Sequence, residues 1–174
     1  MNEMTIRLLL RVTARISFAL CLGAFIAGPL QTFGAGKFAD WLMRNRDRFL
    51  IVLGVSHLVH LGGVISLEMA IGWPRFIKEI TLPVLIGGNI IFLLTYAIAL
   101  GAWARQMHWN WSLANSPRFE TFALYAIMID FTGGFLVRVP NAMIYLLPGG
   151  VAIAALALRV AAHFRKAKPG GATA

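Results

Sequence analysis

Five long apolar stretches dominate this sequence and decide what it can fold into. A helix needs about 20 apolar residues to cross a hydrocarbon core of about 30 Å, and each stretch comes close to that length. Only the fourth carries a charge, Asp130. The stretches cover residues 16–33, 49–67, 80–104, 121–137 and 139–158. Because only helices and closed barrels satisfy their backbone inside lipid, the sequence predicts an all-α integral membrane bundle of about five transmembrane helices.

The charge distribution supports a lipid bilayer as the main partner. Charged residues make up 13% of the chain, about half of what a soluble domain carries. The formal net charge of +9 comes from Lys and Arg between the apolar stretches, where they orient spans and contact headgroups, so we expect no nucleic-acid partner. Six Lys and Arg fall on the N-terminal side and ten on the other. The positive-inside rule then predicts a multi-pass protein of the cell inner (plasma) membrane with a cytoplasmic C-terminus.

Three segments are predicted along the chain. Residues 1–15 form an amphipathic basic N-terminal segment, in which Arg7, Arg11 and Arg15 share one helical face. Residues 16–164 form the transmembrane helical domain. Residues 165–174 form a basic tail with nothing to pack, which we expect to be disordered. A tight turn at Pro140 makes the last two spans antiparallel neighbours.

A histidine pair in the second span is the sharpest chemical feature. His57 and His60 are three residues apart and therefore face roughly the same way on a helix. Measured from Arg48, they lie about 13 and 18 Å deep, near the bilayer centre. Ionisable groups at that depth point to a functional site, and neutral imidazoles can ligate haem iron, relay protons or bond neighbouring helices.

Asp130 is the second candidate. A carboxylate in the middle of a span needs a partner or a proton. His57, His60 and Asn89, all on other spans, are its candidate partners. Asp130 and Asn89 are therefore predicted to be a proton relay or the polar partners of the histidines, with interhelical hydrogen bonding as the alternative.

Glycine pairs recur in each of the last four spans, at 62–63, 87–88, 133–134 and 149–150. They predict close helix packing, with a slot for a flat cofactor as the alternative. Motifs for nucleotide binding, zinc binding or hydrolysis do not occur in the sequence.

Several short motifs together resemble the ferric reductase-like transmembrane domain, a family that includes the haem-bearing membrane subunit of methionine sulfoxide reductase systems. The resemblance covers roughly residues 16–147. The segments that carry it are Gly28-Pro29, Arg44-Asn-Arg-Asp-Arg48, Leu58-Val-His60-Leu61, Ile80-Thr-Leu-Pro-Val-Leu-Ile-Gly87 and Trp109 to Tyr125.

This resemblance implies haem b, with His60 at the position of an axial ligand and no metal beyond that iron. It also implies electron transfer across the membrane, with a membrane or soluble redox partner that supplies the electrons. The family's two haem histidines on the fourth helix have no counterpart here, since the fourth span contains no histidine. Met128 or His57 would have to substitute, or the chain is a degenerate member without standard haem ligation.

Three functions stay open at this point. The first is a membrane redox component of ferric reductase-like architecture. The second is a small proton-coupled transporter that uses His57, His60 and Asp130. The third is a structural or assembly subunit of a larger membrane complex.

Overall fold

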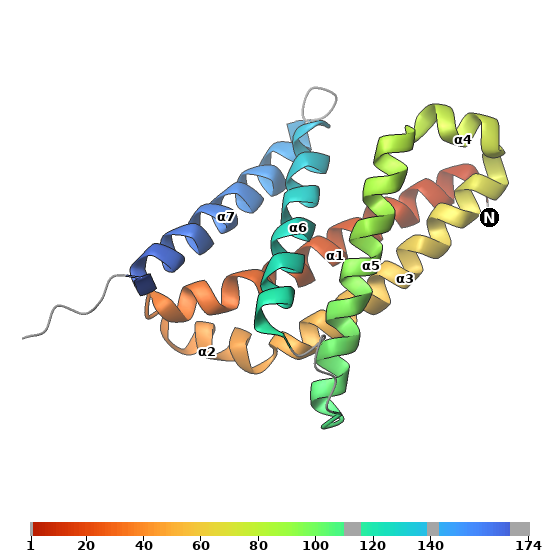
Figure 1. Cartoon of the computed structure of the whole chain (residues 1–174). Coiled ribbons are helices and arrows are strands. Elements are labelled where there is room, and N and C mark those ends of the chain that lie inside the picture. Colours follow the sequence, from red (N-terminus) through yellow and green to blue (C-terminus); the bar gives the residue numbers. More distant parts are fainter. Residues whose placement is uncertain (1, 110–115, 139–142, 168–174) are drawn as a thin grey trace, which may run out of the picture.

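The computed structural model describes residues 2–109, 116–138 and 143–167 (Figure 1). Its five long helices are α1 (Glu3–Thr32), α3 (Arg46–Ile71), α5 (Leu82–Gln106), α6 (Pro117–Leu136) and α7 (Leu146–Ala167). A short 3₁₀ helix, η2 (Met143–Tyr145), leads into α7. Five helices are long and apolar enough to cross a membrane, so the predicted all-α, multi-pass architecture is confirmed.

The connections are more helical than the sequence patterns predicted. The segments between the first three spans contain two short helices, α2 (Gly36–Arg44) and α4 (Trp73–Glu79). Gly72 makes the sharp turn between α3 and α4, with a φ of 78° that favours glycine. The predicted turn at Pro140 and the tail from residue 168 onward lie outside the described residues.

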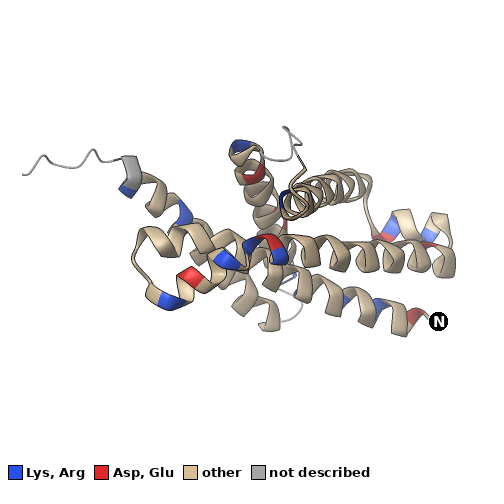
Figure 2. Cartoon of the chain, turned by 90° about the horizontal axis from the view of Figure 1, so that it is seen from below, with Lys and Arg blue, Asp and Glu red and all other residues tan. Residues whose placement is uncertain are grey.

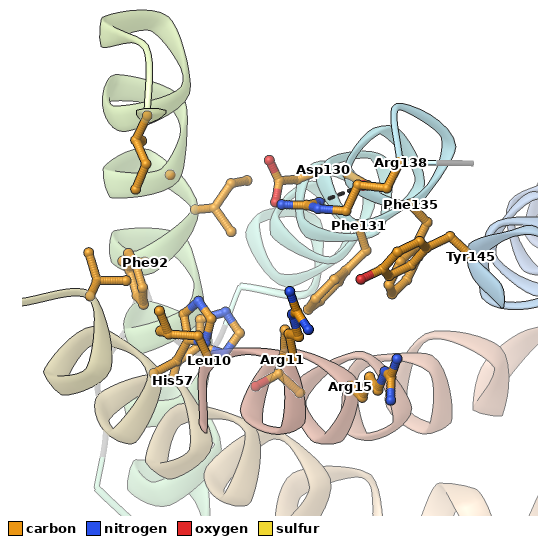
Figure 3. Close-up of a pocket in the computed structure, with 18 residues that line it drawn as sticks. Leu10, Arg11, Arg15, His57, Phe92, Asp130, Phe131, Phe135, Arg138 and Tyr145 are labelled. Atoms are coloured by element: carbon orange, nitrogen blue, oxygen red, sulfur yellow. Dashed lines mark hydrogen bonds between the residues drawn. The ribbon is translucent and has the colours of Figure 1, made fainter. Parts of the chain in front are cut away.

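The first helix is longer than its apolar stretch. The side chain of Asn2 accepts a hydrogen bond from the backbone N–H of Thr5, and this cap starts the helix well before residue 16. The basic N-terminal segment is therefore continuous with the first span. Leu8 and Val12, on its apolar face, are exposed, and so are Arg11 and Arg15, which line the cavity drawn in Figure 3.

The helices pack around α1, which contacts α2, α3, α6 and α7, while α5 lies against α3 and α6. The core is built from one side of each span: Phe18, Cys21 and Phe25 on α1, Leu50 and Leu53 on α3, Ile98 on α5, Leu124, Ile127 and Met128 on α6, and Ala152 on α7. Much of the outer surface is apolar too, as on α5, where Leu93 is 69% exposed and Val84 is 63% exposed. Apolar side chains of this size facing outward are typical of helices surrounded by lipid.

Charged residues gather mainly at the helix ends and in the connecting segments (Figure 2). At one end, Glu120 is 5% exposed and pairs with Arg46 at 2.6 Å and with Arg105 at 2.9 Å. Arg105 also pairs with Asp47 at 2.5 Å. This cluster, called the Glu120 cluster below, ties α3, α5 and α6 together.

A second charged cluster ties the start of α1 to α4. Arg7 pairs with Glu79 at 2.7 Å, and Arg75 pairs with Glu3 at 3.1 Å. The hydrogen bond from the Arg7 guanidinium is the main reason why the pKa of Glu79 lies below its usual range, and Arg75 adds to the effect. Since α4 follows α3 directly, this cluster fixes the N-terminal half of α1 beside the second span.

Candidate functional site

The histidine pair lies on the face of α3 that packs against α1. Nδ1 of His60 forms a 2.8 Å hydrogen bond with the hydroxyl of Thr13, a residue that is only 6% exposed. One turn away, the hydroxyls of Ser17 and Ser56 bond to each other at 2.9 Å. Polar bonds of this kind hold neighbouring spans in register, and this one also fixes the His60 ring. Nε2 is the ring nitrogen that remains for other chemistry.

His57 has a different environment. It is 7% exposed, and its Nδ1 is buried without a hydrogen-bond partner among the described residues. Its ring meets the rings of Phe92 on α5 and Phe131 on α6 edge-on, with centroids 5.4 and 6.3 Å away. The rings of His57 and His60 lie 6.3 Å apart between centroids. A buried polar atom with no partner is rare and indicates a ligand-facing or strained position.

Both histidines line a cavity of about 340 Å³, called the histidine cavity below, between α1, α3, α5 and α6 (Figure 3). Phe92, Phe131 and Phe135 form an aromatic wall, and Tyr145 of η2 also lines the cavity. This volume falls in the range of small-molecule sites in proteins.

Asp130 lines the same cavity, so the structure brings it together with the histidine pair from a different span. It forms no hydrogen bond or ion pair within 4.0 Å with any described residue. Asn89 is not brought there: its side chain is exposed and donates a 2.8 Å hydrogen bond to the Leu85 carbonyl of its own helix. Of the two predicted polar partners, only Asp130 shares the site.

Three arginines complete the cavity and were not predicted as site residues. Arg11 and Arg15 of α1 and Arg138 at the end of α6 line it, and we call them the arginine rim. Arg138 donates a hydrogen bond to the Gly134 carbonyl at 2.5 Å, whereas Arg11 and Arg15 make none with the described residues. Figure 3 shows the Arg138 side chain beside Asp130, and Arg11 pointing from α1 toward the same space. The spacing of Arg11 and Arg15 put them on one face, but nothing in the sequence showed that this face borders a cavity.

The glycine pairs only partly serve helix packing. A Cβ at Gly63 would meet the Leu10 side chain at 2.9 Å, and one at Gly149 would meet Leu136 at 3.2 Å. A Cβ at Gly88, which lines the cavity, would meet nothing within 4 Å. The tightest approach falls outside these pairs, where a Cβ at Gly54 would lie 2.6 Å from Cβ of Ala99.

A haem of the kind that the family resemblance implies finds only one ligand here. His60, with Nε2 left over, could hold an iron from one side. His57 cannot serve as the opposite axial ligand, because it lies one turn from His60 on the same helix. The wall on α6 offers Asp130 and the aromatic residues, and Met128 is fully buried in the core away from the cavity. The residues present therefore do not fit two-histidine ligation.

The fold and the site together define a multi-pass helical membrane protein with a cavity between its spans that is lined by both apolar and ionisable side chains. Within the described part of the chain, no group of three or more His, Cys, Asp or Glu side chains could hold a metal ion. Comparison with protein-family models, curated proteins and solved structures gives no match for the chain. The functional argument therefore comes from the residues of the cavity.

Proposed function

We propose that this protein is a small proton-coupled carrier, with the histidine cavity as the place where substrate and proton meet. The observation that supports the proposal is the presence of His57, His60 and Asp130 in one cavity, contributed by two different spans. Groups that can take up a proton within a membrane domain line ion and proton pathways as a rule.

The charges around these groups suit proton exchange. Asp130 has no bonded partner among the described residues, so its protonation state is free to follow that of a substrate or of the histidines. The arginine rim favours the ionised carboxylate by charge, whereas burial in a membrane favours the neutral form. The two effects oppose each other, so a change in the contents of the cavity can change the protonation of Asp130.

The direction of transport follows from the predicted orientation. The predicted orientation in the plasma membrane puts the C-terminus in the cytoplasm and the N-terminus outside. The arginine rim then lies toward the outer side, because Arg11 and Arg138 belong to the side of the N-terminus. We therefore propose that the cavity takes its substrate from the outer side.

The test is proton movement in vesicles that contain the full-length protein and an internal pH dye. A potential is imposed across the membrane, and internal pH is followed in the wild type, Asp130→Asn and Asp40→Asn. Asp40 is the matched control, because it is an exposed carboxylate on α2, outside the cavity. We expect the flux of the wild type and of Asp40→Asn to exceed that of empty vesicles, and Asp130→Asn to abolish the excess. Equal flux through Asp130→Asn and wild type would refute the proposal.

A membrane redox component of ferric reductase-like architecture is the second candidate, with a redox partner as the source of electrons. The observation in its favour is His60, whose ring is fixed by Thr13 beside a cavity that Gly88 leaves open. Protein purified after expression with excess haem would then show a Soret band that His60→Ala removes and His163→Ala, on the exposed end of α7, leaves intact. A haem-free preparation would exclude this candidate.

A further inference from the structure

The arginine rim carries positive charge that the protein itself does not neutralise. Arg11, Arg15 and Arg138 contribute three positive charges to the histidine cavity, and Asp130 supplies at most one negative charge. Arg11 and Arg15 make no ion pair with the described residues, in contrast to Arg7 on the same face of α1, which pairs with Glu3 and Glu79. The side chains of Arg11, Arg15 and Arg138 are exposed and line the cavity, so an anion that enters it can reach them and neutralise their charge.

The charge balance indicates which anion fits. Three arginines and one ionised aspartate leave a net charge of +2. A phosphate monoester carries about −1.5 to −2 at neutral pH and offers several acceptor oxygens. A guanidinium binds phosphate oxygens through two parallel hydrogen bonds, so several arginines can share one phosphate. A carboxylate carries one negative charge and two oxygens, so it would leave one positive charge of the cavity without a counter-charge.

The remainder of the cavity is apolar. Phe92, Phe131 and Phe135 form the wall that continues from the arginine rim toward the histidines, and Leu10 and Ile91 also line it. A ligand that fills the site would therefore combine a charged group at the rim with an apolar body beside the aromatic wall. Basic pockets between spans bind lipid headgroups in the same way.

We infer that the substrate class of the histidine cavity is an amphiphile with a phosphate headgroup, with its phosphate between the guanidinium groups of the rim and its apolar body along the aromatic wall. This inference rests on the proposed carrier function, because it names what the same cavity carries. Binding of the phosphate amphiphile does not require proton exchange, so binding and proton transport can be tested separately.

The experiment measures ligand-dependent thermal stabilisation of the delipidated full-length protein in a neutral detergent at fixed ionic strength. The probes are dihexanoyl phosphatidic acid, dihexanoyl phosphatidylcholine and inorganic phosphate. We expect the phosphatidic acid to raise the melting temperature with dose, and the other two probes to do so at least tenfold less effectively. Equal stabilisation by phosphatidylcholine would overturn the proposal, and equal stabilisation by inorganic phosphate would overturn its amphiphile part.

Variants show whether the rim is responsible. Arg11→Gln and Arg15→Gln should each weaken binding of the phosphatidic acid by about tenfold or more, because each removes charge-assisted hydrogen bonds. Arg118→Gln is the matched control, since Arg118 is an exposed arginine in the first turn of α6, at the opposite end from Arg138. Arg15→Lys should restore part of the affinity by restoring the charge. Equal losses in Arg118→Gln and Arg15→Gln would refute a site at the rim.

Asp130→Asn separates this inference from the proposed function. It removes the one carboxylate of the cavity, so phosphate binding should stay as tight or become tighter. Retained binding in Asp130→Asn with no proton flux in the wild type would refute the carrier and keep the phosphate site. Proton flux in the wild type without any phosphate binding would refute the phosphate site and keep the carrier.

Discussion

Removing the charge of Glu120 should destabilise the bundle more than any other single charge change outside the cavity. Glu120 is 5% exposed and lies between Arg46 and Arg105, at 2.6 and 2.9 Å. Glu120→Gln keeps the volume of the side chain and leaves two guanidinium groups facing a neutral amide. Breaking a fully buried ion pair in this way costs about 3–5 kcal/mol.

The expected magnitude is smaller here for two structural reasons. The side chains of Arg46 and Arg105 are 25% and 28% exposed, so solvent screens part of their charge. Arg105 also keeps its pair with Asp47. We therefore expect a loss of about 2–3 kcal/mol, below the range of about 3–5 kcal/mol for fully buried pairs. For a chain of this size, that loss corresponds to a fall in melting temperature of roughly 4–12 °C.

The assay is thermal unfolding of the purified protein in a mild detergent, followed by circular dichroism at neutral pH. Asp40→Asn is the control, because Asp40 is an exposed carboxylate whose hydrogen bond from Gln31 is long, at 3.4 Å. It should melt within about 1 °C of the wild type, as surface substitutions usually do. If Glu120→Gln and Asp40→Asn have the same melting temperature, the Glu120 cluster does not hold the three spans together and the reasoning is wrong.

Three further predictions follow from packing, charge and hydrogen bonding. Gly54→Ala should destabilise the bundle by about 1–3 kcal/mol, because the new Cβ would lie 2.6 Å from an alanine Cβ on α5. Gly62→Ala should not destabilise it, because a Cβ there would meet nothing within 4 Å. Equal melting temperatures for the two variants would contradict the close packing at Gly54. The pKa of Glu79 is lowered in the folded protein, so its stabilising effect should be present above the ordinary carboxylate pKa and disappear as the pH falls through the lowered value. The stability difference between wild type and Glu79→Gln, measured by unfolding, should therefore shrink toward zero as the pH is lowered from 7 into the acid range. A difference that stays constant with pH would show that the Glu79 carboxylate does not stabilise the fold through its arginine partners. Thr13→Val should cost about 0.5–1.5 kcal/mol, since it removes the hydrogen bond to His60, and a neutral effect would show that this bond does not hold α1 to α3.

Hydropathy was enough to find the spans because the bilayer imposes a length and an apolar surface on every one of them. Among the described residues, most of each apolar stretch lies within one long helix, and the charges of Arg46, Glu120 and their neighbours fall at the helix ends, where water and headgroups are. Helix ends were harder to place. Capping by Asn2 and the short helices α2 and α4 depend on local hydrogen bonds that hydropathy does not record.

The rotation of each span about its own axis came only from the tertiary structure. A span that is apolar on all sides has almost no amphipathic signal to show which face turns inward. The sequence therefore named His57, His60, Asp130 and Asn89 as candidate site residues, and packing alone brought the first three to one cavity and turned Asn89 outward. The same packing turned Arg11 and Arg15 of the basic face toward that cavity.

By itself, the sequence determined that this chain is an all-α membrane protein with ionisable residues in the middle of its second and fourth spans, because the cost of charge in lipid makes both features visible in a single chain. The tertiary structure alone decided that these residues share a cavity with three arginines. Contacts between spans are made by side chains far apart in the sequence, and their choice depends on how closely the helices fit, as at Gly54 and Ala99.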